Sequence, residues 1–536
     1  MKNSLWKLGL LFVLMIMLVA CASEPDEGEM DADAEESTSG DTEAAGNEGG
    51  DLIIAAGSDA VYLDPHIAND VPSGNVNINI YETLTKFDED LELEGLLAES
   101  WEDIAEDVWE FKLREGITFQ DGSEFNAEVV KMNVERILDD EVASPRKVLF
   151  EIIDEVKVID DYTVQFITSS PFAPLPSHFA HYASSMVSPE AIEADYENAE
   201  AGNEYGAYIS ENPVGTGMFE FESWDPGSEI VLTNNTDYWG EGAKVDTVTF
   251  KVVPETLTRV AEVESGQAHI VDPLISNNIE QLENSSEANI YIRDGASITY
   301  LGFNVEKEPF TDERVRRAIS MALNREEMVD GILDGAGVIA KGPVNDTNFG
   351  YRDDIDAIEF DPEAAKELLA EAGYEDGFST TIWTNDSQER IDIATYAQSL
   401  LADIGVDVEI QELEWGTYLE RTGNGEHEMF ILGLSLGTHD ADYPMHMLFH
   451  SDNAGPPGNR TMMRDETFDE MLHEARIEQD EDTRLDLYVE AANYLNEQSP
   501  MAFLYHPDRI MGYHNTVEGF WSDPSGLYQL KDVTIQ

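Results

Sequence analysis

Residues 378–413 read FSTTIWTNDSQERIDIATYAQSLLADIGVDVEIQEL, and this stretch decides the fold class. FSTTIWT (378–384) and VDVEIQEL (406–413) are rich in β-branched and aromatic residues, which is typical of strands. Between them, ERIDIATYAQSLLADIG (389–405) has helical spacing and ends on a glycine. A strand, a helix and a strand in this order form a parallel pair with a right-handed crossover. The stretch therefore predicts an α/β fold.

The segments around this unit extend the same pattern. DPEAAKELLAEAG (361–373) predicts a helix with proline in its first turn. Two amphipathic helices are expected near 465–478 and 482–498, followed by the strand MAFLYH (501–506). The last forty residues consist of short strand-like pieces.

The first half of the chain is richer in strands. Folded structure is expected to begin at the apolar strand 51–56. In the segments 108–119 and 161–168, apolar and polar residues alternate as in strands. Between them, the apolar residues of NAEVVKMNVERIL (126–138) have helical spacing. Further on, Asp225-Pro226-Gly227 separates MFEFESW from SEIVLTNN and predicts a hairpin.

The N-terminus is typical of an exported lipoprotein. Lys2 and Lys7 precede an apolar run from Leu8 to Ala20, which predicts a signal peptide over residues 1–20. The end of this run resembles a bacterial lipobox, in which the cysteine is lipidated and becomes the first mature residue. Cys21 is the only cysteine of the chain, so no intrachain disulfide can form.

An acidic tether is expected after the lipidated cysteine. Residues 22–50 contain eleven acids and no bases, with almost no large apolar side chains. Such a composition cannot bury a core, so we expect residues 21–50 to be disordered and to span roughly 30 Å. The lipid and the tether would hold the folded body at the outer face of the cell membrane or in the periplasm.

The net charge is strongly negative. The chain has 111 acidic and 30 basic residues, giving a formal charge of −81. Nucleic-acid binding is excluded, because phosphate contacts need clustered cations. The mutual repulsion of so many negative charges indicates a protein that works in salty surroundings, where charges are screened. An ordinary acidic exported protein is the alternative.

Five stretches along the chain match sequence motifs of one protein family. With them, the sequence resembles the family 5 extracellular solute-binding proteins of ABC importers, which include oligopeptide- and dipeptide-binding lipoproteins. The stretches are LAESWE (97–102), WEFKLREGITFQDGSEFNAEVV (109–130), NPVGTGMFEFESWDPGSEIVLTNNTDYWG (212–240), PFTDERVRRAISMALNREEMV (309–329) and GNRTMM (458–463) with FDEMLHEAR (468–476). Locally, Gly215 and Gly217 are expected at positive φ, where the chain crosses between lobes.

The resemblance implies a periplasmic-binding-protein-like fold of the cluster C type, with two lobes, a hinge and an extra α+β domain. Lobe I would comprise 51–84, 213–302 and 508–536, the extra domain 85–212, and lobe II 303–507. It also implies a monomer without cofactors that binds a peptide between the lobes, largely through backbone hydrogen bonds. Closure would then present the loaded protein to a membrane permease.

Motif matching to the family nominates ligand-binding residues in both lobes. Arg146 takes the position of a tyrosine in some relatives and would suit a peptide carboxylate, or it is a surface arginine. Leu419 matches a pocket position, although a core role is equally consistent with its type. The full predicted set is Asn69, Val71, Arg146, Trp415, Leu419, Gly433, Ser435, Gly437, His439, Asp440, Asp442, Tyr505 and His506.

One departure from the family pattern concerns the peptide amine. Peptide-binding relatives carry Gly-Trp, two residues and then an aspartate that holds the α-ammonium group. Here Gly433 matches the glycine, but Gly437 occupies the place of the aspartate. Asp440 and Asp442 follow closely, and we hypothesise that one of them replaces it.

The sequence does not favour a metal site or a hydrolase site. His439, His446 and His450 lie close together in sequence, and some relatives carry nickel complexes, but the apolar residues between them favour a packed segment over a metal site. No nucleophile elbow, HExxH or phosphate loop is present, so nothing indicates a hydrolase. We therefore predict a lipid-anchored receptor for peptides. The alternative cargoes are a nickel chelate, glutathione or a sugar-derived solute.

Overall fold

The structure is a computed structural model that describes residues 49–456 and 458–536. The predicted signal peptide, Cys21 and nearly all of the acidic tether lie outside the described residues. No helix within these ranges is long and apolar enough to cross a membrane.

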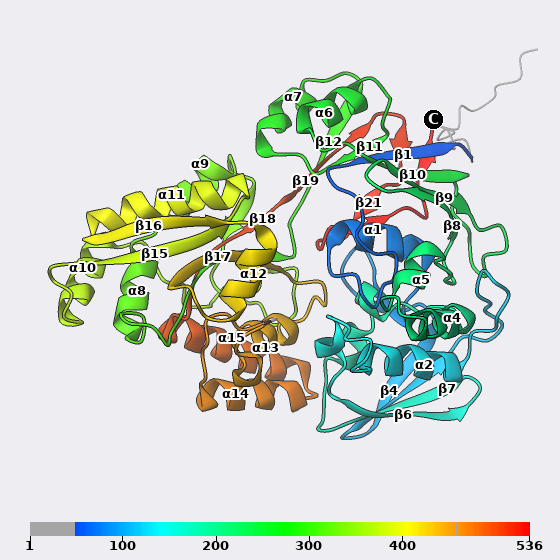
Figure 1. The fold of residues 1–536 in the computed structure, drawn as a ribbon, viewed down its shortest axis with the longest axis horizontal. Helices are drawn as coiled ribbons and strands as arrows, with labels where there is room; N and C mark the ends of the chain where they lie inside the picture. Colours follow the sequence, from blue (N-terminus) through cyan, green and yellow to red (C-terminus); the bar gives the residue numbers. More distant parts are fainter. Residues whose placement is uncertain (1–48, 457) are drawn as a thin grey trace, which may run out of the picture. The chain divides into compact units, whose positions relative to one another are not determined.

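The first large sheet is built from distant parts of the chain (Figure 1). Its central strand β1 pairs in parallel with β10 and β11, while β19 pairs antiparallel with β11 and β12. In order, its strands are β12 (Ala288–Arg293), β19 (Arg509–His514), β11 (Ile270–Asp272), β1 (Asp51–Ala56), β10 (Thr247–Val252), β9 (Glu229–Asn234) and β8 (Phe219–Asp225). Three helices accompany it: α1 (Val71–Ile80), α6 (Thr256–Glu264) and α7 (Ile279–Glu283). The hairpin predicted at Asp225–Gly227 joins β8 to β9.

The second large sheet contains the strand–helix–strand unit of residues 378–413. β15 and β16 pair in parallel, as predicted, and α11 connects them. In order, its strands are β14 (Gly337–Ile339), β18 (Met501–Pro507), β13 (Ser297–Phe303), β17 (Met429–Ser435), β15 (Phe378–Asn385) and β16 (Val406–Leu413). Along β13, Tyr300 packs into one hydrophobic cluster and Leu301 into another, so the sheet is buried on both faces.

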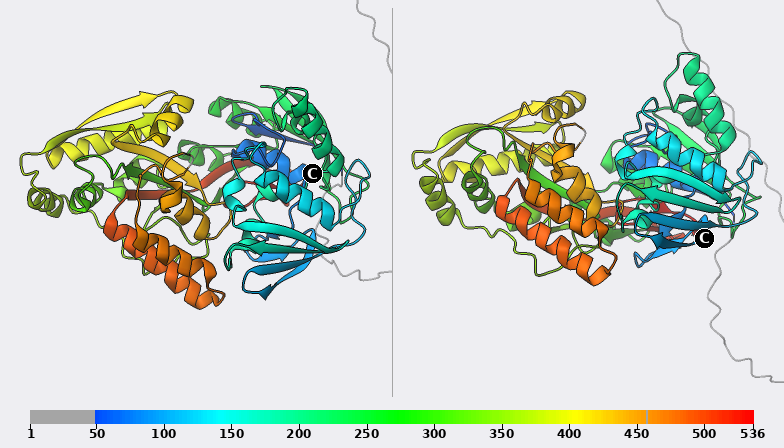
Figure 2. Two further views of the ribbon diagram at one scale, coloured as in Figure 1. Left: turned by 60° about the horizontal axis from the view of Figure 1, so that its bottom comes forward. Right: turned by 90° about the horizontal axis from the view of Figure 1, so that it is seen from below.

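Eight α-helices accompany the second sheet within the described residues. The two amphipathic helices predicted near 465–478 and 482–498 are α14 and α15, which lie side by side in both views of Figure 2. The helices are α8 (Glu313–Met321), α9 (Arg325–Ile332), α10 (Pro362–Glu371), α11 (Gln388–Asp403), α12 (Trp415–Gly423), α13 (Asp442–Phe449), α14 (Glu466–Ile477) and α15 (Glu481–Gln498).

A third, antiparallel sheet lies within residues 85–212, the predicted extra domain. Its strands run in the order β4 (Ala98–Ala105), β5 (Val108–Leu113), β7 (Thr163–Thr168) and β6 (Ile153–Asp160). The helices of this region are α2 (Ala127–Leu138), α3 (Leu175–His178), α4 (Pro189–Glu200) and α5 (Ala207–Glu211). Arg136 of α2 is fully buried and pairs with Asp64 at 2.6 Å and with Asp195 at 2.8 Å. These pairs fasten α2 to the segment before α1 and to α4.

Short strand pairs complete the fold. They are β2 (Thr85–Phe87) with β3 (Leu93–Gly95), β20 (Val517–Glu518) with β23 (Thr534–Ile535), and β21 (Trp521–Ser522) with β22 (Tyr528–Gln529). The last two pairs account for the short strand-like pieces expected in the final forty residues.

The chain passes between the two large sheets at two neighbouring points. One lies between β12 and β13, and the other joins β18 to β19 (Figure 1). A Cβ on Gly295 would lie 2.2 Å from the carbonyl oxygen of Pro507, so these crossings touch and only glycine fits there. β13 belongs to the second sheet, so the predicted boundary after residue 302 is too late and should precede Ser297.

Gly215 and Gly217 are required for a reason other than the one predicted. Neither residue has a positive φ. Added Cβ atoms would instead lie 2.2 Å and 2.6 Å from the carbonyl oxygen of Ile80. The glycines therefore allow the backbone to pass against the end of α1.

Candidate functional site

A cavity of about 440 Å³ collects side chains from many separate segments. From the predicted set, Val71 at the start of α1 lines it together with Ser435, Gly437 and His439, which follow or end β17. Residues around β2 and β3, the segment 180–185, the segment 238–241 and the C-terminal segment complete the wall. The cavity thus joins the loop after β17 of the second sheet to residues outside that sheet.

The loop after β17 is held tightly against its neighbours. His439 has a φ of +49° and its ring meets the ring of Phe87 edge-on, with centroids 4.9 Å apart. Its Nδ1 lies 3.0 Å from the carbonyl oxygen of Thr347, which places the proton of the neutral ring on Nδ1. Burial lowers the pKa of His439, although nearby Asp523 opposes this, so the ring is neutral at pH 7. A Cβ on Gly437 would lie 3.2 Å from the ring of His181.

Asp440 and Asp442 are not among the residues that line this cavity. Asp440 pairs with Arg484 at 2.8 Å, and Asp442 pairs with Arg476 at 2.6 Å. Burial raises the pKa of Asp442, but the charge of Arg476 outweighs this and lowers it. Both carboxylates are neutralised by arginines in this arrangement, and the hypothesis that one of them replaces the missing amine-binding aspartate stays a prediction.

Asp442 and Arg476 also connect α13 and α14 to the extra domain. His178 Nε2 lies 3.8 Å from the carboxylate of Asp442, and the Arg476 guanidinium stacks over Phe172 at 5.0 Å. The backbone N–H of Ala173 donates to the Arg476 carbonyl oxygen at 2.9 Å. The two aspartates therefore have structural roles at the contact of these elements.

Arg146 supports the loop that leads into α1. Its Nε donates to the carbonyl oxygen of Ala68 at 3.1 Å, and its Nη2 donates to the hydroxyl of Tyr182 at 2.7 Å. Tyr182 itself lines the cavity. Arg146 is thus neither a free surface arginine nor a residue of the cavity wall, and it positions the loop that carries Asn69 and Val71. Asn69 is exposed.

The remaining predicted residues are spread over the second sheet. Trp415 is 42% exposed and lies under the Arg390 guanidinium at 5.4 Å, so it remains accessible. Leu419 packs against a hydrophobic cluster, in agreement with its core alternative. Tyr505 is fully buried and donates its hydroxyl to Glu389, while His506 Nδ1 lies 2.8 Å from the Ser297 carbonyl oxygen. Gly433 sits within β17, against β13.

The histidines of the segment 439–450 do not assemble a metal site. His446 and His450 pack ring on ring with centroids 4.5 Å apart, and His446 Nδ1 lies 3.1 Å from the side-chain nitrogen of Asn453. Burial lowers the pKa of His446 to about 3. Throughout residues 49–456 and 458–536, no group of three or more His, Cys, Asp or Glu side chains is placed to hold a metal ion.

Several residues of the cavity wall were missed by the sequence analysis. Glu82 accepts hydrogen bonds from Tyr238 at 2.6 Å, Trp239 at 2.8 Å and Thr216 at 2.8 Å. Burial raises its pKa and these three bonds oppose the rise. Tyr238 and Trp239 lie in the family motif TDYWG. No sequence signal in this motif indicates that both side chains contact Glu82, which lies more than 150 positions earlier.

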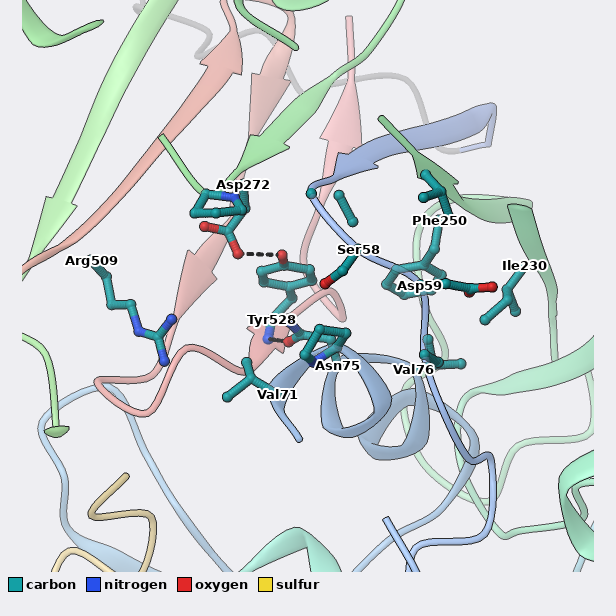
Figure 3. A pocket seen from close by; sticks show the side chains of 16 residues that line it. Ser58, Asp59, Val71, Asn75, Val76, Ile230, Phe250, Asp272, Arg509 and Tyr528 are labelled. Atoms are coloured by element: carbon teal, nitrogen blue, oxygen red, sulfur yellow. Dashed lines mark hydrogen bonds between the residues drawn. The ribbon is translucent and has the colours of Figure 1, made fainter. Parts of the chain in front are cut away.

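A smaller cavity of about 180 Å³ lies beside the first (Figure 3). Val71 lines both cavities, and Tyr528 faces the smaller one while its neighbours Leu527 and Gln529 line the larger. Of the predicted residues, only Val71 belongs to the smaller cavity.

Comparison with known proteins defines the class. The model "Bacterial extracellular solute-binding proteins, family 5 Middle" matches residues 92–456. The chain belongs to this family of solute-binding receptors, which serve ABC importers.

Individual relatives are similar over nearly the full length. The glutathione-binding protein GsiB of Escherichia coli (strain K12) is 31% identical over 91% of this chain and 94% of its own. The periplasmic binding protein DppA of Helicobacter pylori, solved with the peptide STSA, is 31% identical with a TM-score of 0.80, covering 91% and 98% of the two chains. The oligopeptide-binding protein AppA of Bacillus subtilis, solved with a nonapeptide, is 27% identical with a TM-score of 0.78, covering 92% and 100%. These relatives are binding proteins rather than enzymes.

Proposed function

We propose that this receptor captures short peptide-like solutes and delivers them to an ABC import permease. The observation that carries the proposal is that Val71, Ser435, Gly437 and His439 line one cavity of about 440 Å³, after being nominated separately from sequence. Ligand cavities commonly have 300–1,000 Å³, roughly the space that a short peptide requires. The relatives solved with peptides support the same cargo class.

Glutathione is a second candidate cargo, and a specific observation favours it. Gly437 replaces the amine-binding aspartate of peptide-binding relatives, and Asp440 and Asp442 are paired with arginines, which favours a cargo whose α-ammonium group lies elsewhere than that of an ordinary peptide. GsiB, at 31% identity, is a glutathione-binding protein.

Native mass spectrometry of the purified protein tests the proposal, followed by calorimetric titration of ligand-free protein. The titrants are peptides of two to five residues, glutathione and nickel–histidine. We expect either a peptide-like ligand that co-purifies with the protein or a peptide-like titrant that binds in calorimetry. Binding of nickel–histidine alone, or of none of these ligands, would refute the proposal.

We further propose that the lipidated Cys21 anchors the receptor and that the folded body is monomeric. The lipobox-like sequence before Cys21 supports the anchor. In a bacterial host, a Cys21→Ser variant should leave the membrane fraction for the soluble one, while light scattering should report a monomer. A variant that stayed with the membrane would contradict the anchor.

A further inference from the structure

The smaller cavity lies where three parallel strands end. β1, β10 and β11 all contribute residues at their carboxyl ends, and the first turns of α1 close the opposite side (Figure 3). The carboxyl ends of parallel strands are the usual position of ligand sites in open α/β sheets. Two oppositely charged side chains, Asp272 and Arg509, line this cavity.

Asp272 offers one unoccupied carboxylate oxygen. The residue is 7% exposed, and its Oδ2 accepts a hydrogen bond of 2.6 Å from the hydroxyl of Tyr528 (Figure 3). Within the described part of the chain, Oδ1 accepts no hydrogen bond. Burial raises the pKa of this carboxyl, and the charges of Arg509 and Arg259 together with the Tyr528 bond oppose the rise. A buried carboxylate with a free oxygen is a strong acceptor for a cation, since an added positive charge would offset the cost of its burial.

The cavity also holds unused donors. Arg509 Nη2 donates to the carbonyl oxygen of Ser525 at 2.6 Å, and its other two nitrogens donate to nothing in the described ranges. Asn75 is 4% exposed and accepts the N–H of Tyr528 at 2.9 Å through Oδ1. Its amide nitrogen has no acceptor among the residues that the structure describes. The guanidinium and the amide are suited to an incoming carboxylate.

We propose that this cavity is a subsite for an α-amino-acid head group, an ammonium and a carboxylate on one carbon. Asp272 Oδ1 accepts from the ammonium, and Arg509 with Asn75 donates to the carboxylate. Tyr528 is a positioning residue, because its hydroxyl orients the Asp272 carboxylate and its backbone fixes Asn75. This subsite rests on the proposed function, since it defines the chemistry of one end of the same cargo.

The size of the cavity fits this assignment. A cavity of about 150 Å³ is large enough for benzene, so one of 180 Å³ can hold a head group but not a whole peptide. The shared wall at Val71 lets the rest of a cargo continue into the larger cavity. In an ordinary peptide the free ammonium and the free carboxylate belong to opposite ends. Both occur on one carbon in a γ-glutamyl peptide or a free amino acid, and of these only the γ-glutamyl peptide would also use the larger cavity.

The test uses Asp272→Asn, with Asp51→Asn as a control. Asp51 begins β1, at the end of the strand away from this cavity, and its Oδ1 accepts from the Thr247 hydroxyl at 2.7 Å. Both substitutions remove one negative charge. A loss of affinity seen only with Asp272→Asn therefore reports a specific contact and not the change in net charge. Thermal unfolding of each variant verifies that the fold is retained.

Calorimetry measures the dissociation constants of four probes. These are γ-Glu-Cys-Gly, its N-acetyl derivative, α-Glu-Cys-Gly and free glutamine. We expect Asp272→Asn to weaken the binding of γ-Glu-Cys-Gly by about tenfold to a hundredfold, the usual effect of losing a charged hydrogen bond, and Asp51→Asn to change it less than threefold. The N-acetyl derivative should bind the parent and Asp272→Asn equally weakly. Tight binding of glutamine would assign the head group to free amino acids instead of γ-glutamyl peptides.

Three outcomes overturn the subsite. If the parent binds γ-Glu-Cys-Gly and Asp272→Asn binds it equally well, the head group lies elsewhere and the proposed peptide function stands. The same conclusion follows if α-Glu-Cys-Gly binds as tightly as the γ-linked form in the parent. If no peptide-like probe binds the parent, the proposed function fails and the subsite fails with it.

Discussion

The two chain crossings between the large sheets place like charges close together, and this makes stability depend on pH. Asp508 lies between β18 and β19, and Asp294 lies between β12 and β13. Burial, and after it the charge of Asp294, raises the pKa of Asp508 from 3.8 to about 6. The perturbation we choose is Asp508→Asn, which imitates the protonated form at every pH.

The magnitude follows from the shift. A pKa shift from 3.8 to about 6 corresponds to about 3 kcal/mol, at 1.36 kcal/mol per pKa unit. Asp508 is only half-buried, and solvent screening reduces the effect to about 1–1.5 kcal/mol. Because the folded-state pKa is raised, the folded protein binds more protons than the unfolded chain between pH 3.8 and about 6. Its free energy of unfolding therefore falls as pH rises through this window.

Urea denaturation of the parent and of Asp508→Asn at pH 4, 5, 6 and 7.5 measures this difference. We expect equal free energies of unfolding near pH 4 and an advantage of about 1–1.5 kcal/mol for the variant at pH 7.5. In 1 M salt the advantage should shrink, because the Debye length falls to about 3 Å. A variant that is less stable than the parent at pH 7.5, or a difference that does not vary with pH, would refute the reasoning.

Three further predictions follow from other features. Arg136→Met leaves Asp64 and Asp195 buried without a positively charged partner and should cost about 3–5 kcal/mol in urea denaturation, whereas a loss below 1 kcal/mol would show that the pairs contribute little. Asp440→Asn should lower the melting temperature through Arg484 yet leave the ligand dissociation constant within twofold, and a tenfold loss of affinity would restore Asp440 as an amine-binding residue. The melting temperature of the parent should rise from dilute to molar salt because of its charge of −81, and a fall would count against adaptation to salt.

Elements with strong local patterns were predictable from sequence. The parallel pair β15 and β16, the hairpin of β8 and β9, and the long helices α14 and α15 all have the expected type and position. These elements depend on periodicity and turn residues within one short segment. The predicted end of lobe I lies after residue 302, whereas β13 of the second sheet already begins at Ser297; the turn-forming pair Asp294-Gly295 between β12 and β13 marks the change of sheet.

The residues of the candidate site were predictable only at positions that the family's sequence motifs cover. Val71, Ser435, Gly437 and His439, which the family resemblance nominated, line one cavity, and their contact with ligand stays a prediction. The pairing of Asp440 could not be foreseen, because Arg484 lies 44 positions later on another helix. Asp272 and Arg509 had no local signal at all, since the topology of the first sheet alone brings β11 beside β19.

The strand order of the first sheet has a consequence for biosynthesis. β12 lies at one edge of this sheet, and its single neighbour there is β19. A chain made from its N-terminus must therefore complete residues 294–508 before β12 finds a partner. The second sheet and the extra domain draw their strands from continuous ranges and can form earlier. The first sheet is therefore completed only when residues 509–514 join it, and a chain truncated before Arg509 would leave β12 without its neighbour.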